Sequence, residues 1–161
     1  MFKRMARCSA TALSIGRIGI IAFFLLPLFV MGQSEARQEN EIQAQIDGLR
    51  NDRGQVLCAL FSSAGDFPKK SENAVAHAKS MVMHGQANCE FQGIPPGTYA
   101  VSVFHDENSN GKLDTKFMGI PREGVGASNN AKGRFGPPKF SAAAFQYSGG
   151  RVTLKITINY L

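Results

Sequence analysis

Residues 94–114 read IPPGTYAVSVFHDENSNGKLD and combine the two features on which the predicted fold depends. Tyr99, Val101 and Val103 alternate with Ala and Ser, so the three larger side chains fall on one face of an extended chain. A Pro-Pro-Gly turn precedes them, and a polar run rich in Asp and Asn follows. The stretch therefore predicts a half-buried β-strand over Thr98–Phe104 that ends in a polar loop.

Most of the chain beyond its first 40 residues follows the same period. Arg151–Asn159 alternates cleanly, whereas Gln55–Phe61 is a nearly continuous apolar run, typical of a strand at the centre of a sheet. The turn residues in LRNDRGQ (49–55) and HGQ (84–86) predict hairpins. Further strands are predicted over Glu41–Leu49, Ser80–Met83 and Ala87–Phe91.

Two segments depart from this pattern. Ser71–Lys79 has helical character, and the serine at its start is suited to cap a short helix. Residues 119–138 are rich in Gly and Pro and have no period, which predicts a long ordered loop over one end of the domain, pinned from inside by Ile120, Val125 and Phe135. About seven short strands separated by turns predict an all-β fold, a single antiparallel β-sandwich.

The first 36 residues have the layout of a secretory signal peptide. Basic residues between Lys3 and Arg17 precede the apolar run Ile18–Met31, and the small residues Ser34 and Ala36 suit a cleavage site. The apolar run is shorter than the about 20 residues that a membrane helix needs, so an uncleaved anchor is the weaker alternative. We expect a periplasmic or secreted protein with no stable membrane span after cleavage.

The charge of the mature domain argues against nucleic acid as a partner. The whole chain has a formal charge of +6, and residues 1–36 carry four basic residues and one Glu, so their removal lowers the charge to +3. Residues 37–161 contain no clustered basic helix. This length suffices for one domain with an adequate core, and we expect a monomer.

Two cysteines, Cys58 and Cys89, remain after removal of the signal peptide. In an oxidising compartment an even pair predicts a disulfide. Two buried free thiols, which behave as small apolar groups, are the alternative.

The loop that follows Thr98–Phe104 matches the first nine positions of an EF-hand calcium loop. Oxygen-bearing side chains alternate, Gly111 stands at the sharp turn, and the next residue offers its carbonyl. The twelfth position, where a bidentate Glu belongs, is Phe117, so a carboxylate would have to fold back from the long loop. Few charged ligands predict weak binding. The predicted calcium ligands are Asp106, Asn108, Asn110, Lys112, Asp114 and Glu123.

A polar turn that needs no ion is the alternative. Asp and Asn side chains accept hydrogen bonds from backbone N–H groups two residues on, and Asn-Gly is a strong turn former. His105 is expected to be a strand-end residue bonded to this loop rather than a metal ligand, and His77 and His84 are expected at the surface.

No catalytic motif is present in the sequence: it contains no G-x-S-x-G, H-E-x-x-H or C-x-x-C. Ser128 lies beside asparagines without a histidine to activate it. The enzymatic alternative is a small hydrolase that acts on an extracytoplasmic substrate through a carboxylate pair drawn from Asp106, Asp114 and Glu123. We expect no enzyme.

Positive charge gathers in and beside residues 119–138, where Glu123 is the one acidic residue. Arginine and lysine next to aromatic rings suit an anionic glycan, a phosphate group or an envelope polymer, whereas ordinary solvated loop charge is the alternative. The candidate ligand-binding residues are Arg122, Lys132, Arg134, Phe135 and Lys139.

Three stretches together resemble the exported bacterial proteins grouped as domain-of-unknown-function family 2141: GLRNDRGQVLCALF (48–61), IPPGTYAVSVFHDENSNGKLDTKFMGIPREG (94–124) and GASNNAKGRFGPPKFSAAAF (126–145). The likeness covers about residues 42–160, and the family brings no established activity. GIPPGTYAVSV (93–103) is also similar, more distantly, to transthyretin-like and carboxypeptidase-regulatory-like sandwiches. That resemblance implies an exported binding or structural module rather than an enzyme.

Overall fold

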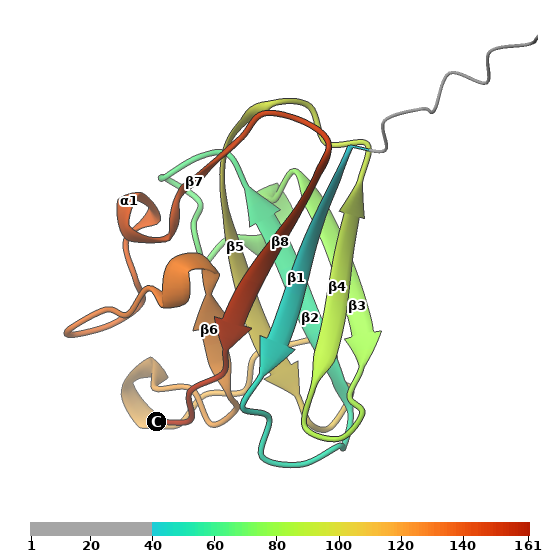
Figure 1. Ribbon diagram of the computed structural model, residues 1–161. Helices are drawn as coiled ribbons and strands as arrows, with labels where there is room; N and C mark the ends of the chain where they lie inside the picture. The colour runs from blue at the N-terminus through green and yellow to red at the C-terminus, as the bar shows by residue number, and fades with distance from the viewer. Residues whose placement is uncertain (1–39) are drawn as a thin grey trace, which may run out of the picture. The chain divides into compact units, whose positions relative to one another are not determined.

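The computed structural model describes residues 40–161, which form two β-sheets that enclose a core (Figure 1). One sheet has the strand order β4-β1-β8, and the other has the order β3-β2-β5-β6, with β7 paired to β5. The strands are β1 (Glu41–Asp47), β2 (Gln55–Phe61), β3 (Ala76–Met81), β4 (Ala87–Gln92), β5 (Gly97–Asp106), β6 (Val125–Ala127), β7 (Phe145–Tyr147) and β8 (Arg151–Thr157). The short helices are η1 (Ser71–Asn73), η2 (Phe117–Gly119), η3 (Ser128–Asn130) and α1 (Phe140–Ala143). The predicted all-β fold is confirmed, and the predicted signal peptide lies outside the described residues.

The alternating sequences place one face of each outer strand in the core. Ile42, Ala44 and Ile46 of β1 are buried, and β1 and β8 align so that Ile46 lies opposite the buried Ile156. Strand β2 is buried on both faces, because Phe61 packs into a second apolar cluster on the outer side of its sheet. The central position predicted for Gln55–Phe61 is therefore confirmed: β2 lies between β3 and β5.

The predicted helix over Ser71–Lys79 is wrong. Only the turn η1 is helical, without a side-chain cap, and the chain becomes strand β3 from Ala76. The sequence AHAKSM also has a period of two, so Ala78 faces the core while His77 lies exposed. Pairing with β2 satisfies the backbone of this segment and outweighs the helical preference of alanine.

The predicted hairpin at LRNDRGQ is wrong, because this turn crosses between the sheets: β1 belongs to one sheet and β2 to the other. The predicted turn at HGQ is confirmed locally, since Met83 and Gln86 exchange backbone hydrogen bonds at 2.8 and 3.1 Å, but its flanking strands β3 and β4 then part into different sheets. The sandwich is not wholly antiparallel either, since β1 and β8 run parallel. The two strand starts are tied together: Glu41 N–H donates to Gly150 O at 2.8 Å, and Gly150 N–H donates to Asn40 Oδ1 at 2.9 Å. The first and last strands of the described chain are thereby tied together in one sheet.

The predicted disulfide is confirmed. Cys58 on β2 and Cys89 on β4 are bonded, with an S–S distance of 2.10 Å, and they join the two sheets through the core. In the chain-entropy model, a bridge over about 30 residues stabilises a fold by roughly 3 to 4 kcal/mol.

Residues 119–138 form an ordered segment, as predicted, but with other anchors. Phe135 is 96% exposed and Ile120 is 46% exposed, so neither pins the segment from inside. The anchors are polar: Ser128 is fully buried and Asn130 Oδ1 accepts the N–H of Thr157 at 2.8 Å. Short strand β6 adds backbone pairing with β5.

Candidate functional site

Asp106 is the centre of the acidic loop, as we call residues 106–114. Its side chain is fully buried. One oxygen accepts the N–H of Asn110 at 3.0 Å, and the other accepts the N–H of Gly111 at 2.8 Å and Nε2 of Gln55 at 2.9 Å. Burial raises the pKa of Asp106, but these hydrogen bonds outweigh the burial, so the pKa lies below its ordinary value.

Glu123, which lies outside residues 106–114 in the sequence, connects the two ends of the acidic loop. It folds back from the long segment, as the sequence predicted, and is 5% exposed. Its Oε1 accepts the N–H of Glu107 at 3.0 Å, and its Oε2 accepts the N–H of Asp114 at 2.9 Å. One carboxylate therefore joins the first and last turns of the loop.

The remaining predicted calcium ligands lie on the exposed side of the acidic loop. Asn108 Nδ2 donates to one oxygen of Asp114 at 2.8 Å, and Asn110 Nδ2 donates to the other at 3.3 Å. The N–H of Lys112 donates to Asn110 Oδ1 at 2.8 Å. The structure thus brings the predicted set together, bonded to one another and to the loop backbone. Within residues 40–161, no group of three or more His, Cys, Asp or Glu side chains is arranged to hold a metal ion, and calcium binding stays a prediction.

The base of the loop rests on the turn between β1 and β2. A Cβ atom at Gly54 would lie 2.0 Å from Asp106 O, so only glycine permits this close approach. Glu107 Oε1 lies 2.7 Å from Nη2 of Arg50. Burial raises the pKa of Glu107, but the hydrogen bond from Arg50 and those from neighbouring groups outweigh it, so the pKa lies below its ordinary value.

His105 is fully buried and uses both ring nitrogens. Nε2 lies 2.7 Å from Arg53 O and donates to it, because a carbonyl oxygen only accepts. Nδ1 is hydrogen-bonded to the hydroxyl of Tyr160 at 2.7 Å. His105 therefore has a structural role, but its partners are the β1–β2 turn and the C-terminal segment rather than the acidic loop that the sequence predicted. His77 and His84 are exposed, as predicted.

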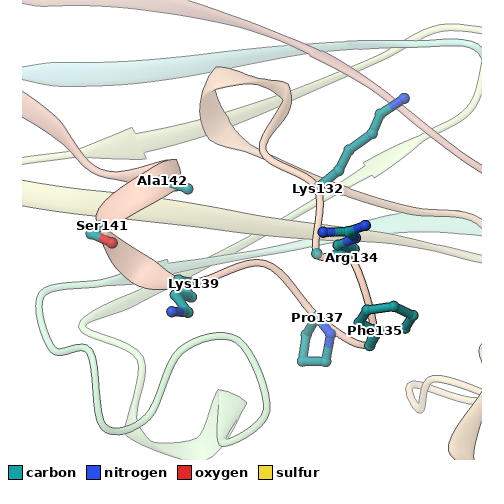
Figure 2. A pocket seen from close by; sticks show the side chains of 8 residues that line it. Lys132, Arg134, Phe135, Pro137, Lys139, Ser141 and Ala142 are labelled. Atoms are coloured by element: carbon teal, nitrogen blue, oxygen red, sulfur yellow. The ribbon is translucent and has the colours of Figure 1, made fainter.

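The second candidate site is a surface hollow of about 360 Å³ (Figure 2). Lys132, Arg134 and Phe135 come from one limb of a loop, and Lys139 comes from the limb that leads into α1. The guanidinium carbon of Arg134 lies 5.6 Å from the ring centroid of Phe135. We call this site the basic hollow; Gly133, Pro137, Ser141 and Ala142 complete its lining. It contains four of the five candidate ligand-binding residues, whereas Arg122 lies elsewhere, beside the acidic loop, where its N–H donates to Asp114 O.

The motif ASNN positions the basic hollow, and sequence reasoning missed it. Ser128 Oγ accepts the N–H of Val101 at 2.9 Å and donates to Ala143 O at 2.6 Å, which ties β5 to α1. Asn129 Nδ2 donates to Ala144 O at 2.8 Å. Asn129 and Asn130 both have positive φ, 58° and 50°. Adjacent asparagines, which tolerate left-handed backbone and bond to nearby main chain, were the available signal.

Comparison with protein-family models gives a match over residues 44–155, to the family described as "Uncharacterized protein conserved in bacteria (DUF2141)". The chain belongs to this family. The match to the DUF2141 family covers β2 to β7 in full and most of β1 and β8, including the acidic loop and the basic hollow. No curated protein and no solved structure matches the chain significantly, and the distant likeness to transthyretin-like domains stays a prediction. In the part of this DUF2141 protein that the structure describes, no helix has the length and apolar character needed to cross a bilayer.

Proposed function

We propose that this DUF2141 protein is an exported, non-catalytic β-sandwich module that binds an anionic envelope or extracellular ligand in the basic hollow. The observation that carries the proposal is that three cationic residues and one exposed phenyl ring line a single surface hollow. No acidic residue is among the described residues that line it.

The charges of the hollow are available to a ligand. Lys132, Arg134 and Lys139 are exposed, and no carboxylate of the described residues lies within 4.0 Å of their charged groups. Arginine can hold a carboxylate or phosphate through two parallel hydrogen bonds. The ring of Phe135 adds an apolar face beside the guanidinium group of Arg134. Charge and apolar face together suit an anionic glycan, whose sugar rings pack on aromatic side chains while its acidic groups meet the cations.

The Cys58–Cys89 disulfide supports the exported location, because such bonds form and persist in oxidising compartments. The predicted signal peptide of residues 1–36 gives the route. Sequencing the N-terminus of the envelope or secreted protein tests both: a terminus near Arg37 is expected, and an intact Met1 in the cytoplasmic fraction would contradict export.

The acidic loop supports a non-catalytic role. A hydrolase that uses two carboxylates needs them to face the scissile bond, one of them with a raised pKa. Asp106 is fully buried and its pKa is lowered. Both carboxylate oxygens of Glu123 accept hydrogen bonds from backbone N–H groups. Their positions therefore favour a structural use of both carboxylates.

We also propose weak calcium binding on the exposed side of the acidic loop, where both oxygens of Asp114 lie beside the Asn108 and Asn110 side chains. The two asparagine amides now donate to Asp114, so on binding they would turn their oxygens toward the ion. Calcium at ten times its Kd would raise the free energy of unfolding by about 1.4 kcal/mol. Thermal unfolding in calcium, with magnesium as the matched control, measures this gain, and Asp114→Asn should remove it. Equal midpoints at 10 mM of either ion, on the order of ten times the weakest affinity of extracellular sites, would overturn calcium binding.

The binding proposal is tested by titrating the protein with short acidic oligosaccharides while following its backbone amide signals by NMR. Signals from residues 132–142 should shift, and neutral oligosaccharides of equal length should leave them unchanged. Arg134→Gln should weaken binding about tenfold, as expected for the loss of a charge-assisted hydrogen bond. Lys79→Gln, on the exposed face of β3, is the matched control. An equal effect of both variants would reduce the hollow to ordinary surface charge.

A further inference from the structure

A second loop carries large apolar side chains into solvent. Residues 114–122 form a narrow hairpin, which we call the apolar hairpin. Its two limbs are joined by the N–H of Lys116 donating to Ile120 O at 2.6 Å and the N–H of Arg122 donating to Asp114 O at 2.8 Å. The tip is the turn η2, where Phe117 is 88% exposed and Met118 is 85% exposed.

This tip is unfavourable for the isolated domain in two ways. Met118 has a φ of 64°, in the left-handed region that side-chain-bearing residues rarely adopt. The exposed phenyl and thioether groups gain nothing from the domain's own core. Leu161 is 68% exposed, and Lys116 Nζ donates to Leu161 O at 2.9 Å, which holds this leucine beside the hairpin. Burial of the Phe117 and Met118 side chains in another apolar environment would offset both the strained backbone of Met118 and the exposure of the two side chains.

The exposed charged side chains on and next to the apolar hairpin are positive: Lys112, Lys116 and Arg122. Two carboxylates lie among them but are less accessible, because Asp114 is half-buried beneath two asparagine amides and Glu123 is buried. The hairpin therefore presents an apolar tip flanked by the cationic side chains of Lys112, Lys116 and Arg122, which we call the cationic collar.

We propose that the apolar hairpin docks the protein on an anionic lipid bilayer, with Phe117 and Met118 inserted at the level of the headgroups and upper acyl chains. The collar then meets the lipid phosphates, and the long stems of lysine and arginine lie along the interface. This surface is separate from the basic hollow in its residues, and the inference does not depend on the binding proposal.

The form and charge of the hairpin select a bilayer over other occupants. The tip is a convex turn, so a protein partner would need a matching groove, whereas lipid headgroups rearrange around any protruding side chain. A second copy of the chain would bring two positive collars together, and their repulsion opposes association. Two inserted side chains and three cations give reversible, peripheral binding rather than permanent anchoring.

Sedimentation with protein-free vesicles tests the inference. The mature protein, which begins near Arg37, should sediment with vesicles made of equal parts phosphatidylglycerol and phosphatidylethanolamine, and much less with phosphatidylcholine vesicles. Phe117→Ser and Met118→Ser should each lower the partition coefficient about tenfold. Lys112→Gln and Arg122→Gln should each lower it about fivefold and make the rest more sensitive to salt. All variants share one N-terminus, so differences among them report the hairpin alone.

The matched control is Phe135→Ser, which removes a phenyl group of similar exposure from the basic hollow. It should leave vesicle binding unchanged while weakening oligosaccharide binding, and Phe117→Ser should do the reverse. Equal loss of vesicle binding in Phe117→Ser and Phe135→Ser would overturn the assignment of membrane docking to the apolar hairpin. So would binding that responds only to the charge variants, which would indicate surface attraction without insertion. Retention by an envelope protein without any vesicle binding would assign the hairpin to a protein groove instead.

Discussion

The acidic loop and the basic hollow both gather charged side chains outside the regular strands, but the acidic loop turns its central charges inward and the basic hollow leaves its charges in solvent. At the acidic loop, Asp106 and the neighbouring Glu123 are buried, and each accepts hydrogen bonds from at least two backbone or side-chain donors. In the basic hollow, Lys132, Arg134 and Lys139 are exposed to solvent, and the Arg134 guanidinium lies next to the exposed ring of Phe135. Charges that are satisfied within the molecule hold it together, and charges that are left to solvent are the ones available to a ligand.

Asp106→Asn should have the largest effect on this comparison. The amide keeps one oxygen but turns an NH2 group toward donors, so buried hydrogen bonds are lost, and the free energy of unfolding should fall by about 3 kcal/mol without any added ion. Urea unfolding measures the loss. Asp114→Asn in the same loop is the control and should change stability by no more than about 0.5 kcal/mol, because its partners are exposed amides that can reorient. Equal, small losses would mean that Asp106 does not organise the loop.

Glu123→Gln should have the next largest effect, about 2 kcal/mol, since one of its two backbone hydrogen bonds must be lost. Hydrogen exchange should accelerate at the amides of Glu107 and Asp114 and remain unchanged in the β2–β5 pairing. Glu90→Gln, exposed on β4, is the matched control. Unchanged exchange at both amides would show that the carboxylate does not close the loop.

Acid should weaken the fold through Asp106 and Glu107. The net pKa shift is downward from 3.8 for Asp106 and from 4.5 for Glu107. Each stabilises the folded state fully above its unfolded pKa, and the stabilisation is lost as the pH falls through the lower, folded pKa. The free energy of unfolding should therefore be nearly constant from pH 7 to about pH 5 and decline below about pH 4.5. Asp106→Asn should decline less steeply, and parallel curves for the two proteins would contradict the assignment.

Local pattern was sufficient to predict β1, β2, β4, β5 and β8, because a period of two places residues such as Ile42, Ala44 and Ile46 on one buried face whatever their neighbours. It did not predict the short strands β6 and β7 or most of β3. Pairing was not predictable in the same way. The segment 71–79 satisfies both a helical and a strand pattern, and only the open edge of β2 decides between them. Likewise, β1 and β8 lie more than 100 residues apart, and no local signal fixes their parallel register.

The candidate sites show the same division between features that local sequence predicts and features that depend on the folded chain. The sequence predicted that Glu123 folds back onto the loop, but which donors it meets depends on the three-dimensional course of the chain. It also predicted four residues of the basic hollow from charge and aromatic composition alone. Phe135 was wrongly expected to serve also as an inner anchor, because hydrophobicity does not reveal that Ser128 and Asn130 already hold the segment.

The smallest expected change in stability, in Arg134→Gln, completes the comparison. The guanidinium is exposed, and its described contact is the adjacent ring of Phe135, so removal of its charge should alter the free energy of unfolding by no more than about 0.5 kcal/mol. The same substitution should weaken oligosaccharide binding about tenfold, as proposed above. Gly133→Ala provides a contrasting variant, because an added Cβ would lie 2.0 Å from Gly136 O and must move the loop backbone. It should weaken binding even though it leaves every charge in place. If it binds as well as the natural protein, charge alone rather than the shape of the hollow holds the ligand.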